Sequence, residues 1–261
     1  MDSFGSFMME IARQAGDWLK GRLDEEHTID YKGIINIVTE ADRQSEEMIV
    51  SAILGRYPGH DILAEEKDRS PQGSPYRWII DPLDGTTNYA HGYPVFCVSI
   101  ALEENGVIRN GVVYNPMLGE MFYACRSEGA FLNGRSIRVS GTRDLSHSLL
   151  ATGFPYDIRE NPDNNMDYFN VMARNAQAIR RAGSAALDMA YVAAGRFDGF
   201  WELRLMPWDT AAGWLLLVEA GGKVTNLSGA PFALDAPHIL ASNGRIHESM
   251  IAALRLASPP G

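Results

Sequence analysis

Residues 78–89 (WIIDPLDGTTNY) constrain the fold of this chain more than any other segment. The apolar run that opens the segment predicts a buried strand, which carries Asp81 to its end. The proline that follows is expected to stop the strand ladder, so that Asp84 comes after a short step. Gly85 permits a tight turn, and Thr86–Asn88 predict the opening of a helix. The segment thus predicts two carboxylates at a strand end, beside the start of a helix.

This combination favours the binding of divalent cations and a phosphate in one place. Hard cations take oxygen ligands, and the free amides and dipole of a helix start attract an anion. Metal-assisted hydrolysis of a phosphate ester needs both features. The segment does not fit an EF-hand, because alternating oxygen ligands and a closing glutamate do not follow at the required spacing. The alternative interpretation is a plain strand, an Asp-rich turn and a capped helix.

Three further segments strengthen the functional interpretation. Residues 61–66 (DILAEE) predict a short strand that ends in an acidic pair, and residues 207–213 (PWDTAAG) precede the apolar run LLLVEAGG. Residues 32–42 (KGIINIVTEAD) combine a lysine loop with a Val-Thr-x-x-Asp pattern. Together with residues 78–89, these segments resemble the motifs of the inositol monophosphatase family in type, order and spacing. The resemblance extends from about Ile11 to about Leu254.

Length and composition are those of a globular protein. A chain of 261 residues, with 46% hydrophobic and 21% charged residues, can form one large domain or two closely packed subdomains. A net charge of −10 argues against a broad nucleic-acid or membrane surface. Cys97 and Cys125 lie in apolar, strand-like runs, so we expect buried free thiols. The sequence shows neither a signal-peptide pattern nor an apolar run of membrane length, which predicts a cytoplasmic location.

The pattern of predicted elements changes near residue 140. Before it, two amphipathic helices, the second beginning near Thr39, are followed by a series of strands typical of antiparallel hairpins. Beyond it, helices and strands alternate, which indicates an α+β fold with an α+β subdomain at 1–140 and a smaller α/β subdomain at 141–261. The family resemblance implies a layered α-β-α-β-α sandwich with the active site between the two parts. The later elements are predicted as helix 165–178, a helix ending at Gly195, strand Phe197–Glu202, helix Thr210–Ala220 and a terminal helix from His247.

The resemblance implies a site for two or three Mg²⁺ ions. Glu65, Asp81 and the Leu83 carbonyl would bind one ion, and Asp81 would bridge to a second ion that Asp84 and Asp209 complete. Glu65 would also hold a weaker third ion through water. Taken alone, Asp209 reads equally as the cap of the following helix, and Glu65 as a solvated strand end.

The resemblance also implies catalytic roles. The amides of Gly85 and Thr86 would bind the phosphate, and a metal-activated water would attack it without a covalent intermediate. Thr86 and Glu65 would orient and deprotonate this water. Asp42 matches the aspartate that contacts the threonine in the family. Its alternative role is that of capping-box partner to Thr39.

The substrate contacts follow from the resemblance in the same way. Glu202 matches a residue that accepts hydrogen bonds from ring hydroxyls, and Ala185 matches a backbone contact in the same pocket. Lys32 matches a lysine on a mobile loop. Glu202 as a plain strand-end charge and Lys32 as an ordinary surface lysine are the alternatives. Asn36 stands where family members often carry an aspartate, which weakens the expected loop contact to the third metal.

The sequence therefore predicts a Mg²⁺-dependent, lithium-sensitive phosphomonoesterase that hydrolyses myo-inositol monophosphate or a related polyol or sugar phosphate, and forms a homodimer. Fructose-1,6-bisphosphatase, histidinol-phosphate phosphatase and a nucleotide 3′-phosphatase are alternatives within the same class, although the last usually has a longer chain. From another class, the alternative is a regulatory protein-binding member that acts in transcription of ribosomal RNA. The pair Arg180 and Arg181, which precedes the GSAA segment, resembles the corresponding segment of bacterial family members. Either subunit packing or substrate contact would account for this pair.

Overall fold

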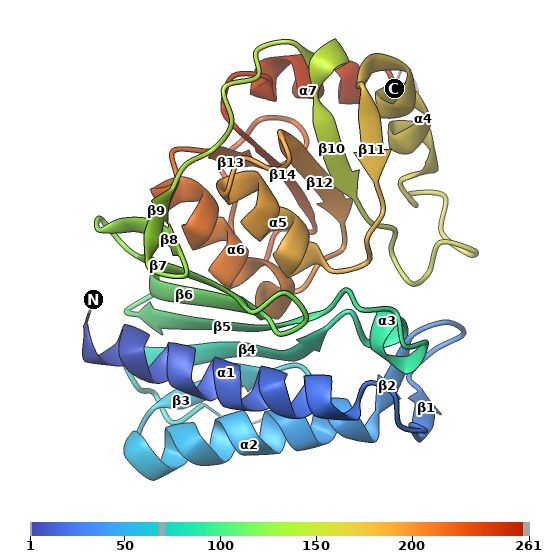
Figure 1. Ribbon diagram of the computed structural model, residues 1–261. Coiled ribbons are helices and arrows are strands. Elements are labelled where there is room, and N and C mark those ends of the chain that lie inside the picture. Colours follow the sequence, from blue (N-terminus) through green and yellow to red (C-terminus); the bar gives the residue numbers. More distant parts are fainter. Residues whose placement is uncertain (1, 68–70, 258–261) are drawn as a thin grey trace.

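The computed structural model of the protein describes residues 2–67 and 71–257, in which helices and sheets alternate as five layers (Figure 1). The order is a helix pair, a sheet, a second helix pair, a second sheet and a third helix pair. The predicted layered α+β fold is thus confirmed. The helices are α1 Ser3–Arg22, α2 Glu40–Arg56, α3 Thr86–Ala90, α4 Met166–Asn175, α5 Ala185–Ala193, α6 Pro207–Glu219 and α7 His247–Arg255, with a 3-10 turn η1 at Leu145–His147.

The first sheet follows the order of the chain. Its strands pair with their sequence neighbours, and all pairs are antiparallel except β3 with β4, which is parallel. The strands are β3 Asp61–Ala64, β4 Tyr76–Asp84, β5 Cys97–Glu104, β6 Val107–Asn115, β7 Glu120–Cys125, β8 Gly129–Leu132 and β9 Arg135–Ile137.

The second sheet is mixed, with the strand order β11-β10-β12-β14-β13. Strand β10 is parallel to both of its neighbours, whereas β14 is antiparallel to both β12 and β13. The alternation of helices and strands beyond residue 140 therefore does form a separate sheet. Its strands are β10 Leu149–Thr152, β11 Ala178–Arg180, β12 Gly199–Leu203, β13 Lys223–Thr225 and β14 His238–Ser242.

The two inner helices, α5 and α6, form the middle layer and are covered by a sheet on each side (Figure 1). Their sequences are apolar almost all round, as expected for helices buried on both sides. Within α5, Tyr191 alone is not fully buried. Small residues bring the layers close together, because a Cβ atom on Gly111 of β6 would lie only 3.0 Å from the Ala212 backbone of α6. The middle layer therefore sets the distance between the two sheets.

The outer layers have separate cores. On one side, α1 buries Met8, Ile11 and Leu19 against the first sheet, at the three- and four-residue spacing predicted from the sequence. On the other side, α4 and α7 cover the second sheet around Trp201, which is fully buried. In helix α2, Thr39 is the N-cap, as predicted.

Three predicted boundaries were wrong. The helix predicted over 165–178 ends at Asn175, because the chain turns there and joins the second sheet as β11. Strand β4 does not stop at Pro82 but continues to Asp84, with an irregular register between Asp81 and Asp84. A bulge of this kind is where a sheet tolerates a proline. Helix α6 begins at Pro207, since proline suits the first position of a helix.

A short hairpin precedes α2. Strands β1 (Ile29–Tyr31) and β2 (Ile37–Thr39) pair antiparallel, and the intervening loop carries Lys32. In the described parts of the chain, none of the helices has the length and apolar character needed to cross a membrane.

We expect Gly111→Ala to destabilise the protein by about 1–3 kcal/mol, because the added methyl group would push α6 away from the first sheet. Urea unfolding measures the change. Gly55→Ala in α2 is the matched control, since no atom lies within 4 Å of the position that its Cβ would take. The control should be neutral or stabilising, as alanine is the better helix former. Equal stability of the two variants would contradict the role assigned to Gly111.

Candidate active site

Strand β4 brings two carboxylates to the boundary between the two sheets. Asp81 is 2% exposed, and its Oδ1 accepts a hydrogen bond of 3.0 Å from the Leu83 amide. The irregular register between Asp81 and Asp84 turns the backbone here, and the buried Leu83 lies inside this turn. Gly85 follows with φ of +106°, and a Cβ atom there would lie 2.9 Å from the Val95 carbonyl oxygen. Glycine is therefore required where β4 passes into α3.

The hydroxyl of Thr86 is held by a buried carboxylate. Thr86 Oγ1 donates to Asp42 Oδ1 at 2.7 Å, and the Leu83 carbonyl oxygen lies 3.2 Å from the same hydroxyl. The other oxygen of Asp42 accepts from the amide of Thr39 at 2.8 Å and from its hydroxyl at 2.6 Å. Asp42 thus makes both contacts that the sequence offered as alternatives: it closes the capping box of α2 and orients Thr86.

The N-terminus of α5 holds Asp84. Its Oδ2 accepts hydrogen bonds of 2.7 Å from the Ser184 hydroxyl and from the Ala186 amide. The amide of Ala185 also interacts with this carboxylate. Burial raises the pKa of Asp84 above its usual value, and the hydrogen bonds from Ser184 and from the amides at the start of α5 oppose this shift. Cys97, buried as predicted, lies 3.8 Å behind the same oxygen.

Asp209 lies in the first turn of α6. Its Oδ2 accepts a hydrogen bond of 2.6 Å from the amide of Met206, the N-cap residue. The capping role considered from the sequence is therefore present. The contact uses one oxygen of the carboxylate, and Asp209 still lines the cavity described below.

The acidic pair after β3 is joined to the lysine loop. Lys32 Nζ lies 2.6 Å from Glu66 Oε1 and 3.4 Å from Glu65 Oε1. The Glu66 amide donates to Glu46 Oε2 of α2 at 2.7 Å, which fixes the backbone at this point. Lys32 is thus in contact with the site, as one of the two interpretations of the sequence required.

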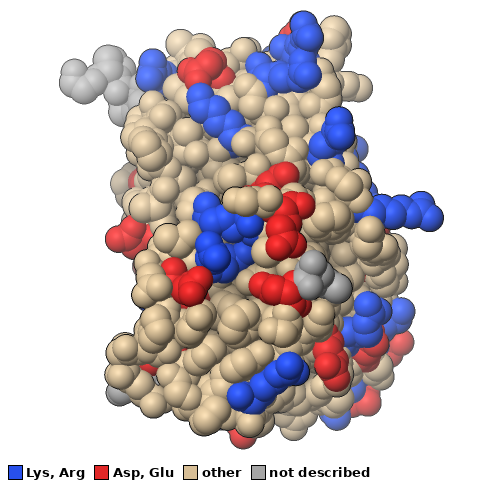
Figure 2. Space-filling model, turned by 90° about the vertical axis from the view of Figure 1, so that its left-hand side faces the viewer, with Lys and Arg blue, Asp and Glu red and all other residues tan. Residues whose placement is uncertain are grey.

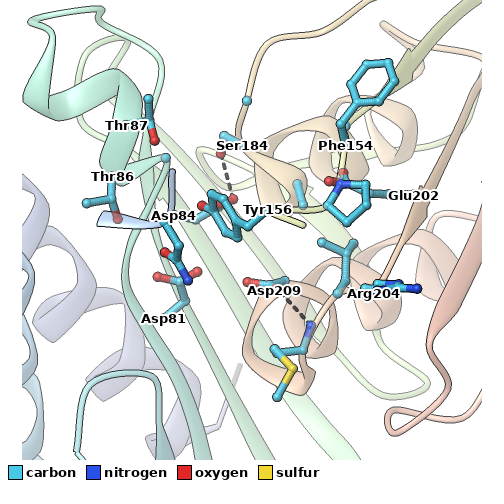
Figure 3. A pocket seen from close by; sticks show the side chains of 18 of the residues that line it. Asp81, Asp84, Thr86, Thr87, Phe154, Tyr156, Ser184, Glu202, Arg204 and Asp209 are labelled. Carbon is cyan, nitrogen blue, oxygen red and sulfur yellow. Dashed lines mark hydrogen bonds between the residues drawn. The ribbon is translucent and has the colours of Figure 1, made fainter. Parts of the chain in front are cut away.

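These groups surround one cavity of about 700 Å³ between the two sheets. In Figure 3, Asp81, Asp84 and Thr86 lie on one side of Tyr156, and Asp209 and Glu202 on the other. Asp42 is buried behind Thr86 and does not line the cavity. The predicted residues that line it are Lys32, Glu65, Asp81, Leu83, Asp84, Gly85, Thr86, Ala185, Glu202 and Asp209.

The carboxylates of the cavity oppose one another's ionisation. Burial, together with the charges of Glu65, Asp84 and Asp209, raises the pKa of Asp81 well above its usual value. Burial and the charges of Asp84 and Glu65 do the same for Asp209. For Glu65, burial raises the pKa to about 7, although Lys32 opposes the shift. A concentration of buried negative charge is unfavourable by itself and becomes favourable when cations bind.

The donor set fits Mg²⁺. Every candidate ligand is an oxygen of a carboxylate or of a backbone carbonyl, which is the chemistry that this ion prefers. Within residues 2–67 and 71–257, no three His, Cys, Asp or Glu side chains form a cage that could hold a metal ion by themselves. Mg²⁺ does not need such a cage, because it usually keeps several waters and shares substrate phosphate oxygens.

Several cavity residues were missed by the sequence analysis. Ser184 holds Asp84, and Asn88 donates 2.7 Å and 2.8 Å hydrogen bonds to the carbonyls of Val95 and Ala182, which joins α3 to the segment before α5. Asp188 and Tyr156 also line the cavity. Ser184 carries a sequence signal, since a serine before an apolar run is typical of a helix N-cap. The loop that carries Tyr156 gave no such signal.

Comparisons with known proteins find relatives that cover most of this chain. The chain matches the inositol monophosphatase family over residues 1–258. It is 50% identical to an inositol-1-monophosphatase of Synechocystis sp. over 84% of this chain and 77% of that protein. It is 42% identical to the Nus factor SuhB of Pseudomonas aeruginosa over 97% of this chain and 96% of that protein. The solved structure of inositol monophosphatase from Anabaena (Nostoc) sp. superposes with a TM-score of 0.90 at 47% identity, covering 98% of this chain and 97% of that one.

The fold is thus that of the solved inositol monophosphatase structures, and the family supports a phosphatase. The chain belongs to the inositol monophosphatase family, which is generally metal-dependent. The resemblance seen in the sequence is confirmed.

We expect Asp81→Asn to reduce Mg²⁺-dependent phosphatase activity to less than about a tenth of the wild-type rate. This corresponds to an increase of at least about 1.4 kcal/mol in the activation free energy. The melting temperature in EDTA should equal or exceed that of the wild type. The raised pKa means that an ionised Asp81 destabilises the metal-free fold at neutral pH, and asparagine removes this charge.

Asp61→Asn is the matched control for a carboxylate outside the cavity. Asp61 accepts hydrogen bonds from the amides of Gln72 and Ser74, so its variant should lose stability and keep its Mg²⁺ response. A clear fall in the EDTA melting temperature of Asp81→Asn would instead assign Asp81 a structural role.

Proposed function

We propose that the protein is a Mg²⁺-dependent phosphomonoesterase that hydrolyses myo-inositol monophosphate or a related polyol or sugar phosphate. One observation carries the proposal: carboxylates from β4, α6 and the end of β3 meet in a single cavity, next to a threonine hydroxyl held by a buried aspartate. The family relationship supports the same class of reaction.

The proposed metal ligands are Glu65, Asp81, Asp84 and Asp209, with the Leu83 carbonyl. All five residues line the cavity. Bound Mg²⁺ would supply Lewis-acid activation of the phosphate and of the attacking water. The protein side of the site is already rigid, since α5 holds Asp84 and the N-terminal turn of α6 holds Asp209.

The attacking water is oriented in this proposal by Thr86 and Glu65. The Thr86 hydroxyl donates a 2.7 Å hydrogen bond to Asp42, so the lone pairs of its oxygen remain free to accept a hydrogen bond from water. Glu65, which lines the cavity at the end of β3, would accept a proton from this water. The Gly85 and Thr86 amides, at the start of α3, would bind the phosphate.

The leaving alcohol would occupy the part of the cavity near Glu202. Glu202 lies on β12 of the second sheet, and the metal-binding aspartate pair lies on β4 of the first. We propose that Glu202 accepts hydrogen bonds from substrate hydroxyls and that Ala185, at the first position of α5, lines the same part. Lys32 would close the opposite end, through its contact with Glu66. The two parts of the chain, 1–140 and 141–261, would then each contribute half of the site.

A second function is favoured by one observation. Arg180 and Arg181 are both exposed, and relatives with the name Nus factor SuhB share 40–42% identity with this chain. We propose that these arginines belong to a contact surface for a protein partner in transcription or for a second subunit of a homodimer. Figure 2 shows a face on which basic and acidic side chains are interspersed rather than gathered into a basic patch. Direct binding of nucleic acid is therefore not proposed, and a cytoplasmic location stays a prediction.

A phosphate-release assay across a panel of small phosphates tests the main proposal. The panel should contain myo-inositol 1-phosphate, fructose 1,6-bisphosphate, histidinol phosphate and a nucleoside 3′-phosphate, each with Mg²⁺ and with EDTA. We expect release that needs Mg²⁺ and is fastest with the inositol or another polyol phosphate. A protein that acts only by binding a partner would release phosphate from none of them.

We expect Glu202→Gln to lower kcat/KM for a polyol phosphate about tenfold to a hundredfold. Because the pKa of Glu202 is raised to about 8, the assay is run above this pH, where the carboxylate is ionised. A hydrogen bond to a charged group contributes about 1.5–3 kcal/mol, and the variant replaces this ionic acceptor with a neutral amide of the same shape. The rate with p-nitrophenyl phosphate, which has no hydroxyls, should hardly change. Equal losses on the two substrates would show that Glu202 supports the structure instead of contacting the substrate.

We also expect Li⁺ to inhibit the Mg²⁺-activated enzyme in an uncompetitive or mixed manner, because Li⁺ would compete for the cation position near Asp84 and Asp209. Initial rates at several substrate and Li⁺ concentrations measure the effect. Na⁺ at the same concentration is the control for ionic strength. Activity that is equal in Li⁺ and Na⁺ would contradict this expectation.

A further inference from the structure

A second carboxyl group accompanies Glu202 at the alcohol end of the cavity. Asp188 lies in the first turn of α5, one helical turn beyond Ser184. It is only 1% exposed, yet it lines the same cavity as Glu202. The charges of Asp188 and Glu202 influence each other through space, since the charge of Glu202 raises the pKa of Asp188. Neither the metal site nor the proposed steps at Thr86 use Asp188.

The protein leaves these two groups without hydrogen-bond donors. Asp188 Oδ1 is buried and has no hydrogen-bond partner. Among the described residues no hydrogen bond reaches Glu202, whose pKa is raised to about 8 by burial and by the charge of Asp84. Buried polar atoms in folded proteins are nearly always paired, and an unpaired one costs about 1–3 kcal/mol. Asp188 Oδ1 is such an atom, and the half-buried side chain of Glu202 in the same cavity also receives no hydrogen bond from the described residues, which indicates that a ligand supplies the donors.

The position of Glu202 is fixed by the backbone next to it. A Cβ atom on Gly153 would lie 2.0 Å from Glu202 Oε1, so the carboxylate occupies the space that any other side chain at position 153 would take. Gly153 itself is held, because Asn165 donates a 2.5 Å hydrogen bond to its carbonyl oxygen. Asp188 stands on the rigid helix α5, and the two acceptors are therefore presented from fixed elements.

The nearby cation favours hydroxyl groups over an ammonium group as the ligand. The charge of Arg181 opposes the raised pKa values of both Asp188 and Glu202, although no ion pair joins it to either within the described residues. Arg181 also lines the cavity. A positive charge already present at this end reduces the gain from a second one, whereas neutral hydroxyls donate hydrogen bonds to the acids at no such cost.

We propose that Asp188 is a specificity-determining residue that binds hydroxyl groups of the leaving alcohol together with Glu202. The two acids would make a paired acceptor site for a polyhydroxylated ring, with the phosphate at the other end of the cavity. This inference rests on the proposed phosphatase function and adds Asp188 to Glu202 as a second contact to the substrate hydroxyls.

The test compares Asp188→Asn with the wild type on two substrates that differ only in ring hydroxyls. With myo-inositol 1-phosphate, kcat/KM should fall about tenfold or more, mainly through KM. With cyclohexyl phosphate, it should change less than about twofold, because that ring donates no hydrogen bonds. Asp188→Asn and Glu202→Gln together should lose less than the product of the two single losses, since both acids bind one ring.

Asp198→Asn is the matched control for a buried carboxylate outside the cavity. Asp198 is 7% exposed, and it accepts hydrogen bonds from the Ser140 hydroxyl and the Leu149 amide. This variant should melt at a lower temperature than the wild type. The ratio of its kcat/KM values for the two substrates should be unchanged. If Asp188→Asn lowers kcat/KM for both substrates by the same factor, as the loss of a structural residue would, the inference is overturned.

Direct binding separates this inference from the proposed function. Saturation-transfer NMR with myo-inositol, in the presence of Mg²⁺ and phosphate, should show binding to the wild type and a loss of it in Asp188→Asn. Binding without turnover would refute the phosphatase proposal and keep the polyol site. Turnover of myo-inositol 1-phosphate with no effect of Asp188→Asn would refute the polyol site alone. If the wild type hydrolyses an amino-alcohol phosphate such as phosphoethanolamine faster than myo-inositol 1-phosphate, the choice of hydroxyl groups over an ammonium group is overturned.

Discussion

The packing of α5 and α6 between two sheets is the constraint on which the rest of the structure depends. Both helices are apolar on nearly all sides, so they are stable only when each face is covered. Once they are placed, their N-terminal turns point at the end of β4. Asp209 in α6 and the amide of Ala186 in α5 then reach the aspartates of the first sheet. The site is thus a consequence of the same packing that buries the central core.

The arrangement has a cost in stability that the function explains. Carboxylates gathered in one cavity raise one another's pKa values, and a protein selected for stability alone would not bury them together. Local hydrogen bonds limit the cost, since a backbone amide contacts each of Asp81, Asp84 and Asp209. The remaining repulsion is what a divalent cation would remove, so binding of the proposed metal would also stabilise the folded protein.

The two ends of the cavity use acids in different ways. At the end where we propose that metal binds, carboxylates are fixed by backbone amides and face one another. At the end proposed for the leaving alcohol, Asp188 and Glu202 line the cavity and receive no side-chain hydrogen bonds from the described residues. The first arrangement suits a cation and the second suits a ligand that carries its own donors.

The sequence by itself determined the elements and most of the chemical groups. The cap at Thr39, the buried face of α1, the turn at Gly85 and the acids of the motifs follow from local rules of spacing and conformation. It did not show that β4 would run past its proline, because the ladder to β5 tolerates an irregular register there.

Only the tertiary structure decided which groups meet. Asp42 contacts Thr86 across 44 positions of the chain, and Asp84 contacts Ser184 across 100. Such pairings depend on how the layers stack, which no local pattern encodes. Asp188 looks like an ordinary helical acid in the sequence. Its unpaired oxygen becomes visible only when α5 is packed between two sheets, because that packing places the carboxylate beside the cavity and away from protein donors.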